Sequence, residues 1–170
     1  MLTQIKLTNF KCFETETTFP LSQFNLLTGM NGRAKSTFLQ ALLLMRQTTE
    51  HETATVVVLN GSCLNLGTLE DVRNQNASKE APIIFEYLSP NHLLRYKLGK
   101  NRENETALVI HEVTTSSLKF KKTIRGFQAY DFAGKEVTGL VTLFNLAPKL
   151  IDSFEESLWS GESVFDKIHY

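Results

Sequence analysis

The chain has 170 residues, of which 42% are hydrophobic, and its 18 basic residues are balanced by 18 acidic ones. This length and apolar content are enough for one domain with a core, and they exclude an intrinsically disordered chain. A net charge of zero excludes a global field that would attract nucleic acid or a membrane. The two cysteines, Cys12 and Cys63, have no paired spacing, so we expect reduced thiols instead of a disulfide framework or a zinc site.

Neither a leader nor a membrane span is indicated. The N-terminus lacks the charged and then apolar pattern of a secretory signal, and the longest apolar run, around Leu42–Met45, is far shorter than a membrane-spanning segment. We therefore expect a cytoplasmic protein with no membrane partner.

The first third of the chain predicts three strands and a helix. Apolar positions from Leu2 to Leu7 begin the first strand, Thr15–Phe19 forms a second, and the apolar run Phe24–Thr28 is expected to be a third. From Ser36 to about Gln47 the apolar residues leave almost no polar face, which predicts a central helix buried on most sides and packed under sheets.

Residues 29–37, between the third predicted strand and the helix, read Gly-Met-Asn-Gly-Arg-Ala-Lys-Ser-Thr. This sequence matches the phosphate-binding P-loop, or Walker A motif, and lies in the strand, loop and helix context that the motif requires. The alternative is a glycine-rich turn that binds no nucleotide. The predicted nucleotide-binding residues of this segment are Gly29, Met30, Asn31, Gly32, Arg33, Ala34, Lys35, Ser36 and Thr37.

Each residue type in this loop has a chemical purpose. Backbone N–H groups and the positive end of the helix dipole would face the β-phosphate of ATP. Lys35 would bridge β- and γ-phosphate oxygens, and the Ser36 hydroxyl would coordinate Mg²⁺, a hard cation that prefers oxygen ligands. Asn31 could reach a γ-phosphate oxygen or its attacking water.

Ala34 departs from the motif, which has glycine at this position. If the backbone here needs a positive φ, the Cβ atom costs roughly 1–2 kcal/mol, and the methyl group crowds the phosphate. We expect this to weaken nucleotide binding by about tenfold without abolishing it.

The middle of the chain predicts antiparallel β-structure. Turn residues separate the runs, for example Ser89-Pro90-Asn91 between two of them. The predicted strands are Thr55–Leu59, Pro82–Leu88, Leu93–Leu98, Thr106–Val113 and Ser117–Ile124. A local basic cluster, Lys119, Lys121, Lys122 and Arg125, is consistent with the solvated face of a strand or with a DNA contact.

Apolar residues recur at helical spacing after Pro148 and predict a helix that ends near Gly161. We therefore expect a P-loop core over residues 1–50, a β-rich subdomain over residues 51–147 and a helical end over residues 148–170. The four histidines show no metal-ligand spacing; they are His51, His92, His111 and His169.

Several segments together resemble a known group. They are Ile5–Phe13 (Ile-Lys-Leu-Thr-Asn-Phe-Lys-Cys-Phe), Leu26–Gly32, Leu39–Gln47 and Leu64–Val72 (Leu-Asn-Leu-Gly-Thr-Leu-Glu-Asp-Val). The chain resembles the N-terminal lobe of ABC-type ATPases of the SMC, RecF and OLD-like kind, and most closely the bacterial members of the AAA group linked to DNA repair or phage defence.

The resemblance implies an α/β fold: the N-terminal half-domain of an ABC-type P-loop NTPase, with a Walker A strand, loop and helix beside a large antiparallel β-subdomain. It implies ATP and Mg²⁺ as cofactors and places Lys11 near the sugar and phosphates; an exposed lysine in a turn is the alternative for Lys11. The implied partners are a C-terminal half of the ATPase, a second copy in a homodimer of the full-length form, and DNA or an effector protein.

Hydrolysis in this group needs an acidic pair after an apolar strand, and also a signature loop from a second protomer. Neither Asp131 nor Asp152 has the preceding apolar strand or a following acidic residue. Leu158–Glu162 matches the signature Leu-Ser-Gly-Gly-Gln only with an insertion and without its second glycine. We therefore expect no catalytic residues in this chain and no efficient ATP turnover by the chain alone.

Three functions follow from these observations. The first is an ATP-binding lobe of a longer ABC-type ATPase, and we favour it. The second is a degenerate, non-hydrolysing module that binds a partner protein. The third is a small P-loop phosphotransferase, which the missing acidic partner disfavours.

Overall fold

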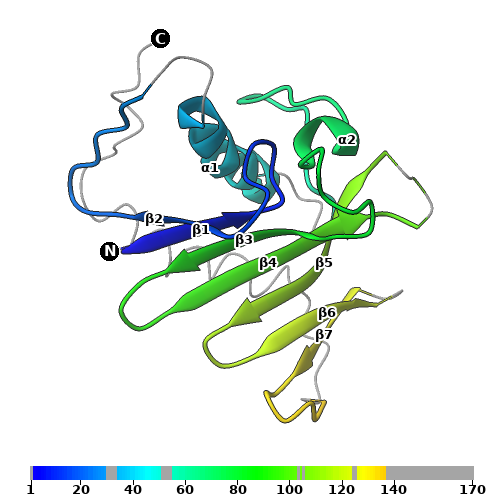
Figure 1. Ribbon diagram of the computed structural model, residues 1–170. Coiled ribbons are helices and arrows are strands. Elements are labelled where there is room, and N and C mark those ends of the chain that lie inside the picture. The colour runs from blue at the N-terminus through cyan, green and yellow to red at the C-terminus, as the bar shows by residue number, and fades with distance from the viewer. Residues whose placement is uncertain are drawn as a thin grey trace.

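A computed structural model describes residues 2–29, 34–50, 55–102, 104, 106–123 and 126–136. Its elements are β1 (Gln4–Thr8), β2 (Thr17–Pro20), α1 (Lys35–Glu50), α2 (Leu69–Val72), β3 (Ile83–Leu88), β4 (Leu93–Lys100), β5 (Leu108–Thr115), β6 (Lys119–Thr123) and β7 (Gly126–Tyr130). Figure 1 shows that the strands form one sheet and that both helices lie on the same side of it.

The sheet contains seven strands in the order β2-β1-β3-β4-β5-β6-β7, and each neighbouring pair is antiparallel. Between β3 and β7 the strands follow chain order, as expected for hairpins joined by short turns. The first two strands lie beside β3, so the predicted P-loop core and the predicted β-rich subdomain contribute to the same sheet. The division at residue 50 stays a prediction.

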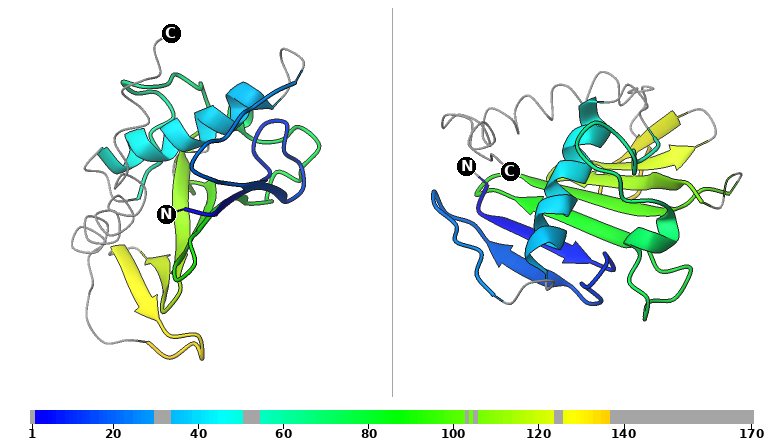
Figure 2. Two further views of the ribbon diagram at one scale, coloured as in Figure 1. Left: turned by 90° about the vertical axis from the view of Figure 1, so that its left-hand side faces the viewer. Right: turned by 90° about the horizontal axis from the view of Figure 1, so that it is seen from above.

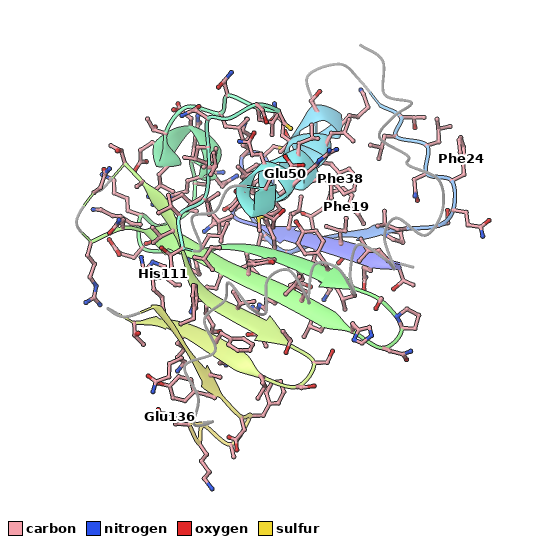
Figure 3. All side chains as sticks on the ribbon, turned by 180° about the vertical axis from the view of Figure 1, so that it is seen from behind. Phe19, Phe24, Phe38, Glu50, His111 and Glu136 are labelled. Carbon is pink, nitrogen blue, oxygen red and sulfur yellow. The ribbon has the colours of Figure 1, made fainter. Side chains whose placement is uncertain are left out.

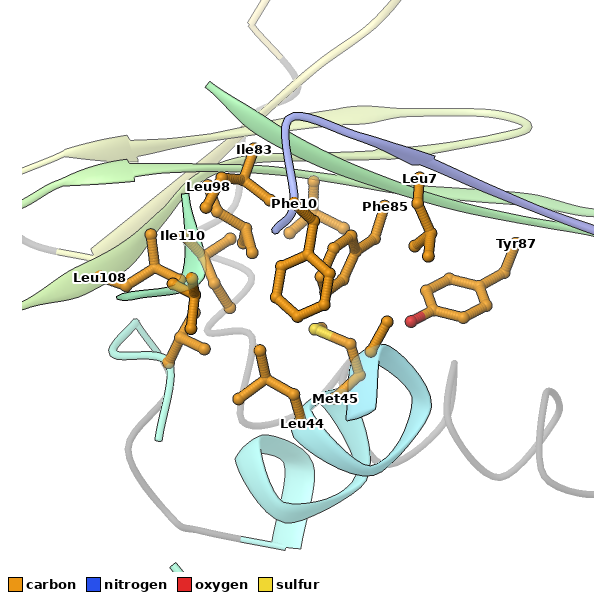
Figure 4. Close-up of a cluster of buried hydrophobic side chains, with 14 of the residues drawn as sticks. Leu7, Phe10, Leu44, Met45, Ile83, Phe85, Tyr87, Leu98, Leu108 and Ile110 are labelled. Carbon is orange, nitrogen blue, oxygen red and sulfur yellow. The ribbon is translucent and has the colours of Figure 1, made fainter. Parts of the chain in front are cut away.

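Alternating side chains give the sheet one buried face. In β3 the burial alternates along Ile83–Leu88, and Phe85 is fully buried. Helix α1 covers this face, as the two views in Figure 2 show. Leu44 and Met45 of α1 point toward Phe10 and Phe85 (Figure 4), and the rings of Phe10 and Phe85 meet edge to face with centroids 5.1 Å apart. Each fully buried side chain of this size contributes about 1.5–3 kcal/mol to the free energy of folding.

A buried amide fixes the C-terminal half of α1 to the chain that follows. Gln47 is almost fully buried, and its Nε2 atom donates to the carbonyl oxygen of Val58. Its Oε1 atom accepts from the backbone N–H of Leu64 at 2.9 Å. These bonds provide partners for the buried Gln47 amide, which would cost about 1–3 kcal/mol if it were buried without them.

The structure confirms the first, second and most later strands, but two predicted strands are wrong. Residues 24–28 are not a strand, because no described strand pairs with them. Residues 55–59 also form no strand and make only an isolated bridge between Val56 and Val109. Two elements were not predicted: the short helix α2 and the last strand, β7.

Helix α1 is enclosed over most of its length. Phe38, Ala41 and Leu44 are buried against the sheet, and from residue 38 to residue 48 only Leu39 and Arg46 are exposed. The prediction of a helix buried on most sides is therefore confirmed for this stretch, with one sheet and the segment bonded to Gln47 as its cover. The predicted helix after Pro148 lies outside the described residues.

Candidate nucleotide-binding site

The described part of the predicted P-loop lies at the N-terminal end of α1. Lys35, Ser36 and Thr37 form the first turn of this helix, and Gly29 ends the segment that leads to the loop. Met30, Asn31, Gly32 and Arg33 lie outside the described residues. The structure therefore places both ends of the predicted loop, but the strand predicted before it does not form.

The N-terminus of α1 is suited to an anion. The first backbone bond at this end runs from the N–H of Phe38 to the carbonyl oxygen of Ala34, at 2.9 Å. In any α-helix the first N–H groups point out of the N-terminal end, toward a group outside the helix. No acidic residue lies in this first turn, and Ser36 is exposed. The dipole and the N–H groups at this end thus favour a bound negative charge.

Ala34 has a φ of +60°, in the left-handed region that glycine adopts more readily. This is the position at which the motif has glycine, and the conformation confirms the positive φ that the motif led us to consider. The Cβ atom makes this geometry cost roughly 1–2 kcal/mol. The chain accepts this strain at the residue that turns the loop into α1.

Lys35 joins the two ends of the loop. Its ammonium donates to the carbonyl oxygen of Gly29 at 2.6 Å, so the two described ends of the predicted loop lie close together. Gly29 itself has a φ of +141°. The Lys35 ammonium therefore lies beside the Gly29 carbonyl, near the N-terminus of α1 that a phosphate would approach.

A second lysine reaches the same helix from the segment after β1. Lys11 Nζ donates to Gln40 Oε1 at 2.8 Å, and Gln40 lies one helical turn beyond Ser36. Partial burial lowers the pKa of Lys11, whereas the carboxylate of Asp71 raises it to a lesser extent. The hydrogen-bond partner of this ammonium is thus a neutral amide, and an anion nearby would offset its burial.

The backbone around Lys11 is held in an unusual conformation. Asn9 and Lys11 have φ values of +63° and +49°. Asn74 secures both: its side-chain amide donates to the carbonyl oxygen of Lys11 at 2.6 Å, and its backbone N–H donates to that of Asn9 at 3.1 Å. The N–H of Lys11 in turn donates to the carbonyl oxygen of Val72, at 2.8 Å. Strained residues of this kind cluster at ligand sites and switch regions.

Asp71 anchors the helix that precedes Asn74. Its Oδ2 atom accepts from the backbone N–H of Thr68 at 2.7 Å and from the Thr68 hydroxyl at 2.8 Å. These bonds, the backbone one first, hold the pKa of Asp71 below its ordinary value, and the Lys11 charge acts in the same direction. The motif search missed Gln40, Asn74 and Asp71, and only the resemblance over Leu64–Val72 drew attention to this segment.

The segment before the loop exposes large apolar side chains. Phe24 is 80% exposed and Leu26 is 74% exposed, and Figure 3 shows Phe24 directed away from the rest of the structure. Phe19 on β2, by contrast, packs on Phe38 of α1 with ring centroids 4.4 Å apart. Monomeric proteins rarely expose large apolar patches, so the exposure of these side chains indicates that the segment contacts another strand or another chain.

The acidic candidates do not join this site. Asp131 follows β7, at the edge of the sheet opposite β2, and its Oδ1 atom accepts from the backbone N–H of Lys135 at 2.8 Å. Asp152 and Leu158–Glu162 lie outside the described residues. Within the described ranges, no three His, Cys, Asp or Glu side chains gather as metal ligands. Nor does any helix in those ranges have the length and apolar character needed to cross a membrane.

A comparison with protein families finds a match over most of the chain. A family model described as AAA ATPase domain matches residues 1–144, which include α1, the whole sheet and both ends of the loop. Neither the curated proteins nor the solved structures give a match.

Proposed function

This chain belongs to the AAA ATPase domain family, and from that premise we propose that it binds Mg-ATP at the N-terminus of α1. Family membership supports an ATP-binding, ATPase-like function. We assign the phosphates to residues 29–37, with Lys35 as the charge partner of the β- and γ-phosphates and Ser36 as the Mg²⁺ ligand. The chemistry that Mg²⁺ supplies is neutralisation of phosphate charge.

One observation carries this assignment: the Lys35 ammonium bonds to the Gly29 carbonyl beside the first turn of α1, in which Ser36 is exposed. A γ-phosphate would replace this neutral acceptor with a charged one, and charge-assisted hydrogen bonds are roughly twice as strong as neutral ones. Lys11, whose pKa is lowered by burial, bonds to Gln40, which lies one turn beyond Ser36 in α1. We propose that it contacts the sugar and phosphates from that side.

The finer relationship is also a proposal. We propose an ABC-type lobe of the SMC, RecF and OLD-like kind, acting in DNA repair or phage defence as a homodimer in its full-length form. A C-terminal half of the ATPase would supply the strands that pair with residues 24–28. The exposure of Phe24 and Leu26 supports this, because large apolar side chains next to the predicted P-loop would be buried by strands of a partner segment.

We further propose that the chain alone binds ATP without efficient turnover. Hydrolysis needs an acidic group positioned against Mg²⁺ and water beside the γ-phosphate. The candidate Asp131 holds a turn at the far edge of the sheet, which supports the assignment of this chemistry to another part of the ATPase.

A calorimetric titration with Mg-ATP tests the binding site directly. We expect saturable binding by the parent chain, loss of most affinity in Lys35→Ala, and up to about tenfold tighter binding in Ala34→Gly because glycine relieves the left-handed strain. Lys79→Ala is the matched control, since Lys79 is an exposed lysine in the loop before β3.

Equal affinities in the parent chain, Lys35→Ala and Ala34→Gly would refute the P-loop assignment. Absence of binding in all variants would favour the second function, a non-hydrolysing module. The exposed segment around Phe24 and Leu26 would then be the first surface to test for a protein partner.

A further inference from the structure

A second candidate site lies on the β6–β7 hairpin, at the opposite end of the sheet from β2 (Figure 1). In β6, Lys119 and Lys121 alternate with Phe120, which is buried. Both lysines therefore lie on the face of the sheet away from Phe120. The register places Lys119 opposite Tyr130 and Lys121 opposite Gln128 on β7.

These side chains border a hollow of about 220 Å³, which we call the hairpin groove. Its lining residues are Lys119, Lys121, Tyr130, Asp131, Phe132 and Gly134. The turn after β7 contributes Asp131, Phe132 and Gly134 to the lining. Within this turn the N–H of Gly134 donates to the carbonyl oxygen of Asp131 at 3.0 Å. Glu136, labelled in Figure 3, marks the end of this hairpin region, which projects away from α1.

Aromatic rings form part of the groove and remain accessible. Phe132 is 63% exposed although it is a large apolar side chain. Tyr130 is oriented by its neighbours: its hydroxyl donates to Gln128 Oε1 at 3.1 Å, and Lys121 Nζ lies 5.5 Å from the centroid of its ring. A planar ligand can stack on an exposed ring, while the ammonium beside it offers a charge.

The groove is lined by two ammonium groups and one carboxylate, those of Lys119, Lys121 and Asp131. The third lysine of β6, Lys122, is on the same face as Phe120. On the groove face, Lys121 pairs with Glu112 on β5, and Glu112 pairs with Lys97 on β4. Glu112 lies 3.8 Å from Lys119 and offsets part of this charge. The carboxylate of Asp131 accepts the Lys135 N–H within the turn. Glu136 pairs with Tyr130 and adds a carboxylate beside the hairpin. Within the lining of the groove itself, two lysines face one aspartate.

We propose that the hairpin groove binds single-stranded nucleic acid, with a base stacked on Phe132 and flanking phosphates on Lys119 and Lys121. Exposed aromatic rings beside a basic surface are the combination that such strands require, since every base presents a π-face and every linkage a negative charge. A duplex keeps its bases stacked inside and cannot use the ring. An acidic peptide would use the lysines but would leave Phe132 without a planar partner.

The test is fluorescence anisotropy of the full chain with a labelled oligothymidylate of about 12 nucleotides, a length within the range of single-strand sites. We expect Lys121→Ala and Phe132→Ala each to weaken binding by about tenfold. Lys121→Ala should also make the negative slope of log K against log salt less steep by about 0.7, the value for one phosphate contact on a single strand. Loss of Phe132 should leave that slope unchanged, because stacking releases no counterions.

Matched controls separate this site from general effects. Lys79→Ala removes an exposed lysine far along the sequence, and Phe24→Ala removes an exposed phenylalanine at the other end of the sheet. Both should bind the oligonucleotide as the parent does. Thermal unfolding of each variant should show an unchanged midpoint. Lys35→Ala should retain oligonucleotide binding, and Lys121→Ala should retain Mg-ATP binding, so that failure at one site is distinguishable from failure at the other.

Three results would overturn the proposal: no change in anisotropy at low salt, equal weakening in the control variants, or a duplex of the same length that binds at least as tightly. Competition by polyglutamate as effective as that by unlabelled oligonucleotide would also overturn it, because the lysines would then act as a general polyanion surface without stacking.

Discussion

Two apolar segments of this chain have opposite environments. Phe85 on β3 is fully buried between β1, β4 and α1, whereas Phe24, before the predicted loop, is 80% exposed. Both lie in runs whose composition predicts a strand. The difference is that β3 has two paired neighbours within the described chain and residues 24–28 have none. Composition thus identifies residues that require burial, but it does not show whether the same chain supplies the partner.

The largest expected effect comes from truncating one phenylalanine in each segment. Phe85→Ala should lower the free energy of unfolding by about 3–5 kcal/mol, because it removes a filled volume beside Phe10 and leaves a cavity under α1. Phe24→Ala should change it by less than about 0.5 kcal/mol. Urea unfolding, with unchanged m-values as a condition, measures both. A comparable loss in Phe24→Ala would mean that residues 24–28 are buried in solution.

The same distinction explains which elements the sequence predicts. β3 and β4 alternate clearly and are separated by Ser89-Pro90-Asn91, so local signals define them. α1 is recognised by its run of residues with high helix propensity. α2 has only four residues, too few for a periodic signal. β7 follows β6 so closely that no clear turn signal separates them, and its position depends on pairing with β6.

In the candidate site, too, local sequence patterns predict some residues, whereas others are brought in by contacts with distant parts of the chain. The P-loop pattern locates Lys35 and Ser36, and the missing glycine correctly draws attention to the backbone of Ala34. The contact of Lys11 with Gln40 depends on a loop held by Asn74, which is 63 residues away in the chain. No local pattern encodes a bond over that distance.

Ala34 and Gly134 both have a left-handed backbone, and substitutions at these two positions should change the free energy of unfolding by smaller amounts and in opposite directions. Ala34 has a φ of +60° and carries a Cβ atom, whereas Gly134 has a φ of +82° and has open space around it. Ala34→Gly should raise the free energy of unfolding by about 0.5–1 kcal/mol, after allowance for the greater freedom of glycine in the unfolded chain. Gly134→Ala should lower it by about 1 kcal/mol through strain alone. Urea midpoints of the two variants should shift in opposite directions.

A shift of the same sign in both variants would contradict the role of φ at these positions. It would indicate that the new or lost methyl group, and not the backbone, determines the effect at one of them. Ala41→Gly, within the buried face of α1, provides a helical comparison in which glycine is expected to destabilise by about 1 kcal/mol or more.

The smallest expected effect is a change in the pH dependence of the free energy of unfolding, caused by His111 on β5. His111 Nε2 lies 3.1 Å from the carbonyl oxygen of Lys100, and the ring covers Gly99, where an added Cβ atom would lie 2.6 Å from it. Burial lowers the pKa of His111, the Lys100 carbonyl opposes this, and the charges of Lys122, Lys97 and Arg102 lower it further.

The folded chain therefore binds a proton at His111 less readily than the unfolded chain, in which the pKa is about 6.5. Acidification through about pH 6.5 should favour the unfolded state, so the stability present at higher pH is lost as pH falls toward the folded pKa. His111→Gln keeps a side-chain donor but cannot titrate, and its urea midpoint should decrease less between about pH 7.5 and pH 5.5 than that of the parent chain. His92→Gln, at the exposed β3–β4 turn, is the control. Identical pH profiles for the parent and His111→Gln would mean that the ring is hydrated in solution and that the strands around Gly99 pack less closely than the structure describes.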